Sequence, residues 1–184
     1  PPSIRITMRV YNTLTQQKEE LVPLVPGKIG LYVCGPTVYS FIHIGNARTF
    51  TSFDVVARYL RYRGFQVRYV RNFTDVDDKI INAAKETGEA PADLATRFIR
   101  EFEADAKALH LLAPDVSPRV SETIPEIIAL IQRLIANGVV PLELARFIGK
   151  LPVSFNAPGG CCRSASIGVV AVACQLALCG AILS

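Results

Sequence analysis

The sequence predicts an α/β fold with a parallel sheet, because a strand, a helix and a second strand follow one another within residues 31–70. Residues 31–34 form a short apolar run that ends at Gly35 and Pro36, a pair that signals a turn. Residues 47–63 carry apolar and aromatic side chains at helical spacing, and Gly64 follows them as a helix C-cap would. Residues 66–70 alternate and are rich in β-forming types, which favours a second strand.

Helices are expected for most of the chain from residue 77 to residue 137. Residues 74–77 form a polar turn with capping residues, and they predict a helix from about residue 77 to residue 85. Residues 92–110 place their apolar side chains on one face and predict an amphipathic helix. A last helix is expected to begin with Ser121 as its cap and to end at Asn137 and Gly138.

The chain changes character near residue 140. Residues 1–140 carry 17 Lys/Arg and 15 Asp/Glu, whereas residues 141–184 carry three basic residues and one acidic residue. Residues 167–183 are almost wholly apolar, but they are short for a membrane helix and are broken by Gln175 and glycines. We therefore expect residues 141–184 to be an atypical tail, either disordered or not native coding sequence, and we expect no membrane partner. A membrane span and a divergent native tail are the alternatives.

The cysteines indicate the cellular compartment, and the net charge bears on which partners the protein can bind. Five cysteines, four of them in the tail, make a poor disulfide framework and predict a reducing compartment, the cytoplasm. The adjacent pair Cys161 and Cys162 lacks the spacing of a metal-binding motif. The start of the chain is polar and predicts no secretory signal. The net charge of +4 permits an RNA partner without requiring one.

The segment from Cys34 to Asn46 has the pattern of a ligand-binding loop. A strand ends at Cys34 and a helix begins near Gly45, which is where open α/β sheets bind ligands. The free N–H groups and partial positive charge of a helix N-terminus favour a phosphate there, and a glycine lets a flat ligand approach the backbone. His43 can donate to phosphate oxygens as their charge rises. The alternative is that His43 only caps the helix.

Several motifs, in order and at matching spacing, resemble those of cysteinyl-tRNA synthetases. His43-Ile44-Gly45-Asn46 is similar to the HIGH signature of class I aminoacyl-tRNA synthetases, with Asn in place of the last His. The resemblance runs from about Met8 to Gly138. Its other segments are Tyr11-Asn12-Thr13-Leu14-Thr15 with Lys18-Glu19, Leu31-Tyr32-Val33-Cys34-Gly35, Ala47-Arg48-Thr49, Phe53-Asp54, and the run from Tyr69 to Ile80.

The resemblance implies a fold and a reaction. The fold is the N-terminal part of a Rossmann-like nucleotide-binding catalytic domain over residues 1–140, with a helical connection from about residue 92. The reaction is ATP-dependent activation of cysteine to cysteinyl-adenylate, followed by transfer to tRNA, with zinc as cofactor and ATP with magnesium as substrate. It implies the following site residues: catalytic, His43 and Asn46; ATP-binding, Thr37, His43, Gly45 and Asn46; cysteine-binding, Cys34, Gly35 and Thr74; zinc ligand, Cys34.

Other interpretations of the same residues stay open. Cys34 alone is typical of a small buried residue, and Asp75, Asp77 and Asp78 are typical of helix capping. Five arginines, interleaved with tyrosines, can hold RNA phosphates or form solvated faces: Arg58, Arg61, Arg63, Arg68 and Arg71.

The family's lysine loop, its remaining zinc ligands and its anticodon-binding helices have no counterpart in the sequence, so we expect this chain alone to be inactive or nearly so. Two other functions remain. One is a ligase that joins activated cysteine to a small amino sugar, although Lys79 after Asp78 favours the synthetase. The other is a non-enzymatic remnant that binds nucleotide or RNA.

Overall fold

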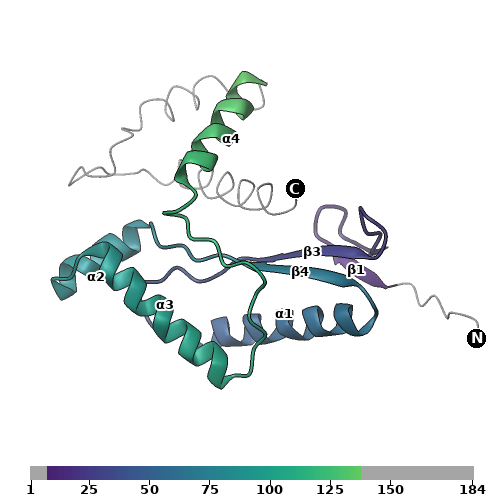
Figure 1. The fold of residues 1–184 in the computed structure, drawn as a ribbon, viewed down its shortest axis with the longest axis horizontal. Helices are drawn as coiled ribbons and strands as arrows, with labels where there is room; N and C mark the ends of the chain where they lie inside the picture. The colour runs from purple at the N-terminus through teal and green to yellow at the C-terminus, as the bar shows by residue number, and fades with distance from the viewer. Residues whose placement is uncertain (1–7, 138–184) are drawn as a thin grey trace, which may run out of the picture.

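A pair of parallel strands forms the centre of the structure, a computed structural model that describes residues 8–137 (Figure 1). β3 (Lys28–Val33) pairs with β4 (Gln66–Arg71) from Lys28 opposite Gln66 to Val33 opposite Arg71. α1 (Ile44–Tyr62) connects the two strands. The predicted strand–helix–strand unit is confirmed, although its first strand begins at Lys28 rather than at residue 31.

A third parallel line of chain, which the sequence did not predict, runs along the other side of β4. Isolated bridges join Val70 to Val116 and Phe73 to Arg119 in parallel register. The Arg71 N–H donates to the Val116 carbonyl over 3.2 Å, and the Phe73 N–H donates to the Pro118 carbonyl over 2.9 Å. Prolines in this segment hide its strand character in the sequence, because proline is depleted in strands.

Three helices follow β4: α2 (Asp78–Thr87), α3 (Pro91–Ala108) and α4 (Ile124–Ala136). Asp77 caps α2 by accepting the Lys79 N–H over 2.8 Å. α3 begins at proline, since the first helical position needs no N–H partner. The prediction that Ser121 caps α4 is wrong, because Ser121 donates instead to the Asp75 carboxylate and the helix begins at Ile124.

The core lies between one face of the sheet and the helices α1 and α3, which lie on the same side of it (Figure 1). Phe50 of α1 meets Phe102 of α3 edge to face, with ring centroids 5.2 Å apart, and Phe73 meets Phe102 at 5.5 Å. Each buried phenylalanine contributes roughly 1.5–3 kcal/mol. This packing fixes the ends of β3 and β4, from which the candidate site is built.

An antiparallel hairpin of β1 (Arg9–Asn12) and β2 (Gln17–Glu20), also not predicted, lies at the end of the sheet away from α2 (Figure 1). Its strands are short and polar, so they lack the apolar alternation that would indicate a sheet. Glu19 ties the turn by accepting from the Thr15 hydroxyl and from the Asn12 amide. These two hydrogen bonds hold the pKa of Glu19 below its ordinary value.

No helix within residues 8–137 is long and apolar enough to cross a membrane. The predicted tail at 141–184, with four of the five cysteines, lies outside the described residues. A helix does begin at Pro91, where the connection was expected, whereas the domain boundary near residue 140 stays a prediction.

Candidate functional site

Two loops meet at the carboxyl ends of the parallel strands, and they hold the predicted site residues. We call residues 34–46 the first loop and residues 72–78 the second loop. Thr37 of the first loop forms a parallel bridge with Thr74 of the second. The Thr74 N–H donates to the Pro36 carbonyl over 3.1 Å, and the Val38 N–H donates to the Thr74 carbonyl over 3.2 Å. The ladder between β3 and β4 thus continues into the loops and brings Thr37 and Thr74 together.

Gly35 lies directly against Asn72, a residue that the sequence analysis did not single out. The Gly35 N–H donates to Asn72 Oδ1 over 2.9 Å. A Cβ atom at position 35 would lie 1.5 Å from the Asn72 carbonyl oxygen, so only glycine fits. Asn72 is 4% exposed, and its amide also donates to Thr74 Oγ1 over 3.4 Å. The only sequence signal for this role is a polar side chain at the end of a buried strand.

His43 caps α1, as the alternative interpretation proposed. Its ring Nδ1 accepts the Gly45 N–H over 3.1 Å. A ring nitrogen that accepts a hydrogen bond carries no proton, so a neutral His43 has its proton on Nε2. Capping therefore leaves Nε2–H as a donor on an exposed side chain. The cap and the predicted donor role are compatible in one tautomer.

Asn46 completes a capping box, and this corrects the expectation of free N–H groups at this helix end. Asn46 Oδ1 accepts the His43 N–H over 3.3 Å, and the Asn46 N–H donates to the His43 carbonyl over 2.8 Å. Because the Gly45 and Asn46 N–H groups are used by the cap, a phosphate here would meet side-chain donors and the helix dipole. A Cβ atom at Gly45 would contact only His43 Nδ1, at 3.4 Å, so the space beside Gly45 is open.

Cys34 is a free, exposed cysteine at the end of β3. Its thiol lies 3.8 Å from the Gly35 carbonyl oxygen, which is a weak contact. Within residues 8–137, no group of three or more His, Cys, Asp or Glu side chains could hold a metal ion. Zinc in proteins is almost always four-coordinate. The described residues therefore supply one thiolate and do not fit a zinc site by themselves.

Two acidic side chains of the second loop, those of Asp75 and Asp77, make structural contacts. The Asp75 carboxylate accepts the Ser121 N–H over 2.9 Å and also the Ser121 hydroxyl. Asp77 caps α2. A link between α2 and the first loop, which the sequence did not indicate, comes from Lys79, whose Nζ lies 5.6 Å from the centre of the Tyr39 ring.

The arginines that were considered as an RNA surface are largely engaged within the chain. Arg58 pairs with Asp54 at 2.7 Å, and Arg61 pairs with Asp115 at 3.2 Å. Arg71 is 4% exposed. Contacts within the chain account for these three arginines. RNA binding by the five arginines together stays a prediction.

A family model described as the class I (C) tRNA synthetase catalytic domain matches residues 20–142. The chain belongs to this family. The expected resemblance is thereby confirmed, and the two loops that hold the candidate site lie inside the matched part of this synthetase domain.

Three curated relatives of this synthetase family are each named cysteine–tRNA ligase. The relative from Anaeromyxobacter sp. (strain K) is 60% identical over 133 residues, which cover 72% of this chain and 28% of the relative. The relative from Vibrio atlanticus (strain LGP32) is 51% identical over 154 residues, or 78% of this chain and 33% of the relative. The relative from Pyrococcus horikoshii is 55% identical over 133 residues, again 72% and 28%. The chain thus spans a third or less of their length.

Proposed function

We propose that this chain supplies the N-terminal part of the catalytic site of a cysteine–tRNA ligase. The protein would activate cysteine with ATP to cysteinyl-adenylate and then transfer the cysteinyl group to tRNA. The observation that carries the proposal is the 60% identity over 133 residues to a relative of that name, together with two loops joined at the carboxyl ends of parallel strands. Neither the amino-sugar ligase nor the non-enzymatic remnant has an observation of its own in its favour.

The first loop would bind ATP and stabilise charge on its phosphates, with magnesium accompanying the nucleotide. His43 would donate through Nε2–H, because Nδ1 is occupied by the Gly45 N–H. Asn46 would donate through its side-chain amide, because its oxygen accepts the His43 N–H. The open space beside Gly45 would admit the nucleotide, and Thr37 would line its other side. Donors held in place before the reaction stabilise a transition state without reorganisation.

Cys34, Gly35 and Thr74 would bind the substrate cysteine. Thr74 Oγ1 accepts from the Asn72 amide, which leaves its hydroxyl proton to donate to the substrate. Cys34 would supply one thiolate to the zinc ion that the family resemblance implies, and the other ligands would have to come from outside residues 8–137. Zinc prefers sulfur ligands and can distinguish a thiolate from a hydroxyl.

The compartment and the activity of the isolated chain are also proposals. A free exposed thiol at Cys34 suits a reducing cytoplasm. Because the matched part covers 28% of the relative, we expect the 184-residue chain alone to give no cysteine-dependent exchange of pyrophosphate into ATP. Measurable exchange by the pure chain would contradict this expectation.

A chimera tests the proposed function directly. The 133-residue segment of the Anaeromyxobacter ligase that aligns with this chain is replaced by the segment from this chain. Cysteine-dependent pyrophosphate exchange and tRNA charging are then measured. We expect both activities to stay within about tenfold of the parent enzyme, a loss of at most about 1.4 kcal/mol in transition-state stabilisation.

Two controls make the result of the chimera interpretable. Circular dichroism and thermal unfolding establish that the chimera folds, and serine in place of cysteine establishes substrate selectivity. A folded chimera that exchanges no pyrophosphate would overturn the proposal. A folded chimera that prefers serine would overturn the assignment of cysteine.

A further inference from the structure

Arg71 is a buried cation at the end of β4. It is 4% exposed, and its Nε atom has no hydrogen-bond partner. The four ion pairs found among residues 8–137 do not include it. A buried charge costs several kcal/mol unless an opposite charge or strong hydrogen bonds offset that cost. The position of Arg71 therefore needs a physical reason.

Neutral groups supply the contacts of the Arg71 guanidinium inside the protein. Its carbon Cζ lies 4.8 Å from the centre of the Phe102 ring and 5.5 Å from that of Phe50. Its positive charge also acts on the Tyr69 phenol, two residues earlier on β4. Burial raises the pKa of Tyr69, while the charge of Arg71 opposes that shift, so the phenol is neutral. Contacts with aromatic rings offset about 2 kcal/mol of the free energy lost when a cation is buried. The rings are neutral, so they do not balance the positive charge.

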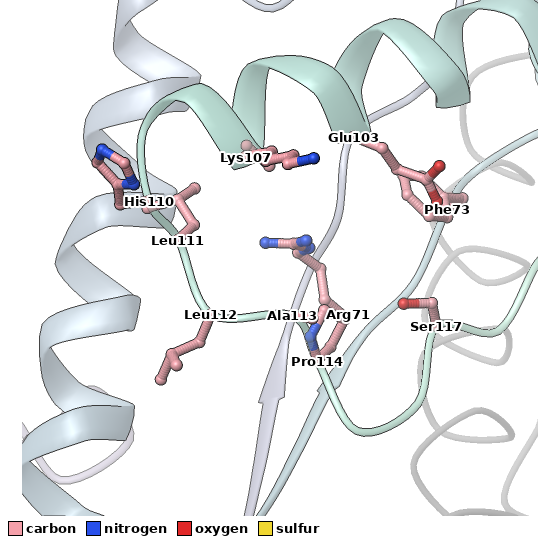
Figure 2. Close-up of a pocket in the computed structure, with 11 residues that line it drawn as sticks. Arg71, Phe73, Glu103, Lys107, His110, Leu111, Leu112, Ala113, Pro114 and Ser117 are labelled. Atoms are coloured by element: carbon pink, nitrogen blue, oxygen red, sulfur yellow. The ribbon is translucent and has the colours of Figure 1, made fainter.

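Arg71 opens onto a cavity of about 550 Å³ beside the last turns of α3. This volume falls in the range of roughly 300–1,000 Å³ that small-molecule sites occupy. In Figure 2 the Lys107 ammonium and the Ser117 hydroxyl point into the same space as the guanidinium. Glu103 is the one acidic residue among the lining side chains. None of the predicted site residues lines this cavity.

We propose that this cavity, to which Phe73 is the one contribution of the second loop, is a second anion site that binds a phosphate group apart from the predicted site residues. A guanidinium offers parallel donors that match phosphate oxygens, and an ammonium adds a second positive charge. Arg71 and Lys107 outnumber Glu103 among the lining residues, so the cavity has a net positive charge that attracts an anion. The bound anion supplies the counter-charge that Arg71 lacks inside the protein.

Titration of the 184-residue chain with inorganic phosphate tests the proposal. Ionic strength is held constant with chloride, and binding is followed by calorimetry and by the rise in the unfolding temperature. We expect saturable binding at the cavity, distinct from any binding of phosphate by the first loop. Lys107→Gln should weaken it by about fivefold, and Glu103→Gln should tighten it, since each changes one charge beside the anion. Adenosine monophosphate in place of phosphate distinguishes the sources: equal affinity assigns a nucleotide monoester, and weaker affinity assigns free phosphate.

Two variants outside the cavity serve as controls. Arg100→Gln removes an exposed charge from the same helix without touching the cavity, and it should leave the affinity unchanged. His43→Asn alters the first loop and should leave unchanged the part of the binding that depends on Lys107. The proposal is overturned if phosphate shows no saturable binding, if Arg100→Gln weakens it as much as Lys107→Gln does, or if only His43→Asn abolishes it. It is also overturned if Glu103→Gln leaves phosphate affinity unchanged and destabilises the fold, because Glu103 would then be the partner of Arg71.

Discussion

The two loops of the candidate site contain similar polar residues but use them differently. In the first loop, Cys34, His43 and Gly45 are exposed, and the His43 cap leaves its Nε2–H available. In the second loop, the side chains of Asn72 and Asp75 are bound within the fold, the former to Gly35 and the latter to Ser121. The first loop keeps side chains exposed, and Asn72 of the second loop holds Gly35 of the first in place.

This difference shows that polar side chains at the end of a strand do not all belong to the chemistry of a site. A side chain whose acceptors are filled by backbone N–H groups serves the fold. A side chain that caps with one atom and leaves another for a ligand, as His43 does, can serve both. Paired substitutions separate the two roles. Each pair compares a residue that is bound within the fold with one that is exposed at the site.

The pair Gly35→Ala and Gly45→Ala should give the largest contrast in stability. A Cβ atom at position 35 would lie 1.5 Å from the Asn72 carbonyl oxygen, which is backbone and has no room to move. We expect Gly35→Ala to lose more than about 4 kcal/mol of unfolding free energy. Gly45→Ala should change it by less than about 1 kcal/mol, because alanine suits a helix better than glycine. Urea unfolding measures both, and equal losses would contradict the contrast.

The pair Asn72→Ala and Asn46→Ala tests the two asparagines. Asn72→Ala removes the acceptor of the part-buried Gly35 N–H and should cost about 1–3 kcal/mol. Asn46→Ala removes one hydrogen bond of an exposed capping box and should cost less than about 1 kcal/mol. Urea unfolding monitored by circular dichroism gives both values. If Asn46→Ala proved the more damaging, the second loop would not be the support.

The tie between Asp75 and Ser121 should have a smaller effect. Asp75→Ala removes the acceptor for the Ser121 N–H and hydroxyl, and on a partly exposed pair we expect a cost of about 1 kcal/mol. Ser121→Ala should lose less unfolding free energy, because the backbone N–H of residue 121 still donates to the Asp75 carboxylate. In a double-mutant cycle, the double variant should be no less stable than Asp75→Ala. Additive losses would show that the two residues do not interact.

The sequence predicted the elements whose signals are local. β4 and the first helix of the parallel unit follow from periodicity and from Gly64, and the cap of α2 follows from Asp77. The line of chain at residues 114–120 could not be predicted, because its pairing with β4 is set by tertiary contacts and its prolines oppose a strand pattern. The same holds for the hairpin of β1 and β2, which is short and polar.

Site residues that belong to a sequence motif could be predicted, whereas residues whose role depends on tertiary packing could not. Thr37 and Thr74 were predicted, and the structure brings them together across the loops. Asn72 and Lys79 act through contacts with residues about 40 positions earlier, Gly35 and Tyr39, which no local pattern encodes. Arg71 looked like part of a charged surface, yet strand alternation turns it into the core.

The most direct test of the division between the loops is His43→Asn in the chimeric ligase. Asparagine is a good N-cap, so the unfolding free energy should stay within about 0.5 kcal/mol of the parent chimera. The donor at Nε2 is lost, so cysteine-dependent pyrophosphate exchange should fall by about 10²- to 10³-fold in kcat. A stable variant with that loss supports a first loop that carries chemistry. A stable variant that keeps full exchange would contradict it, and His43 would then be a helix cap alone.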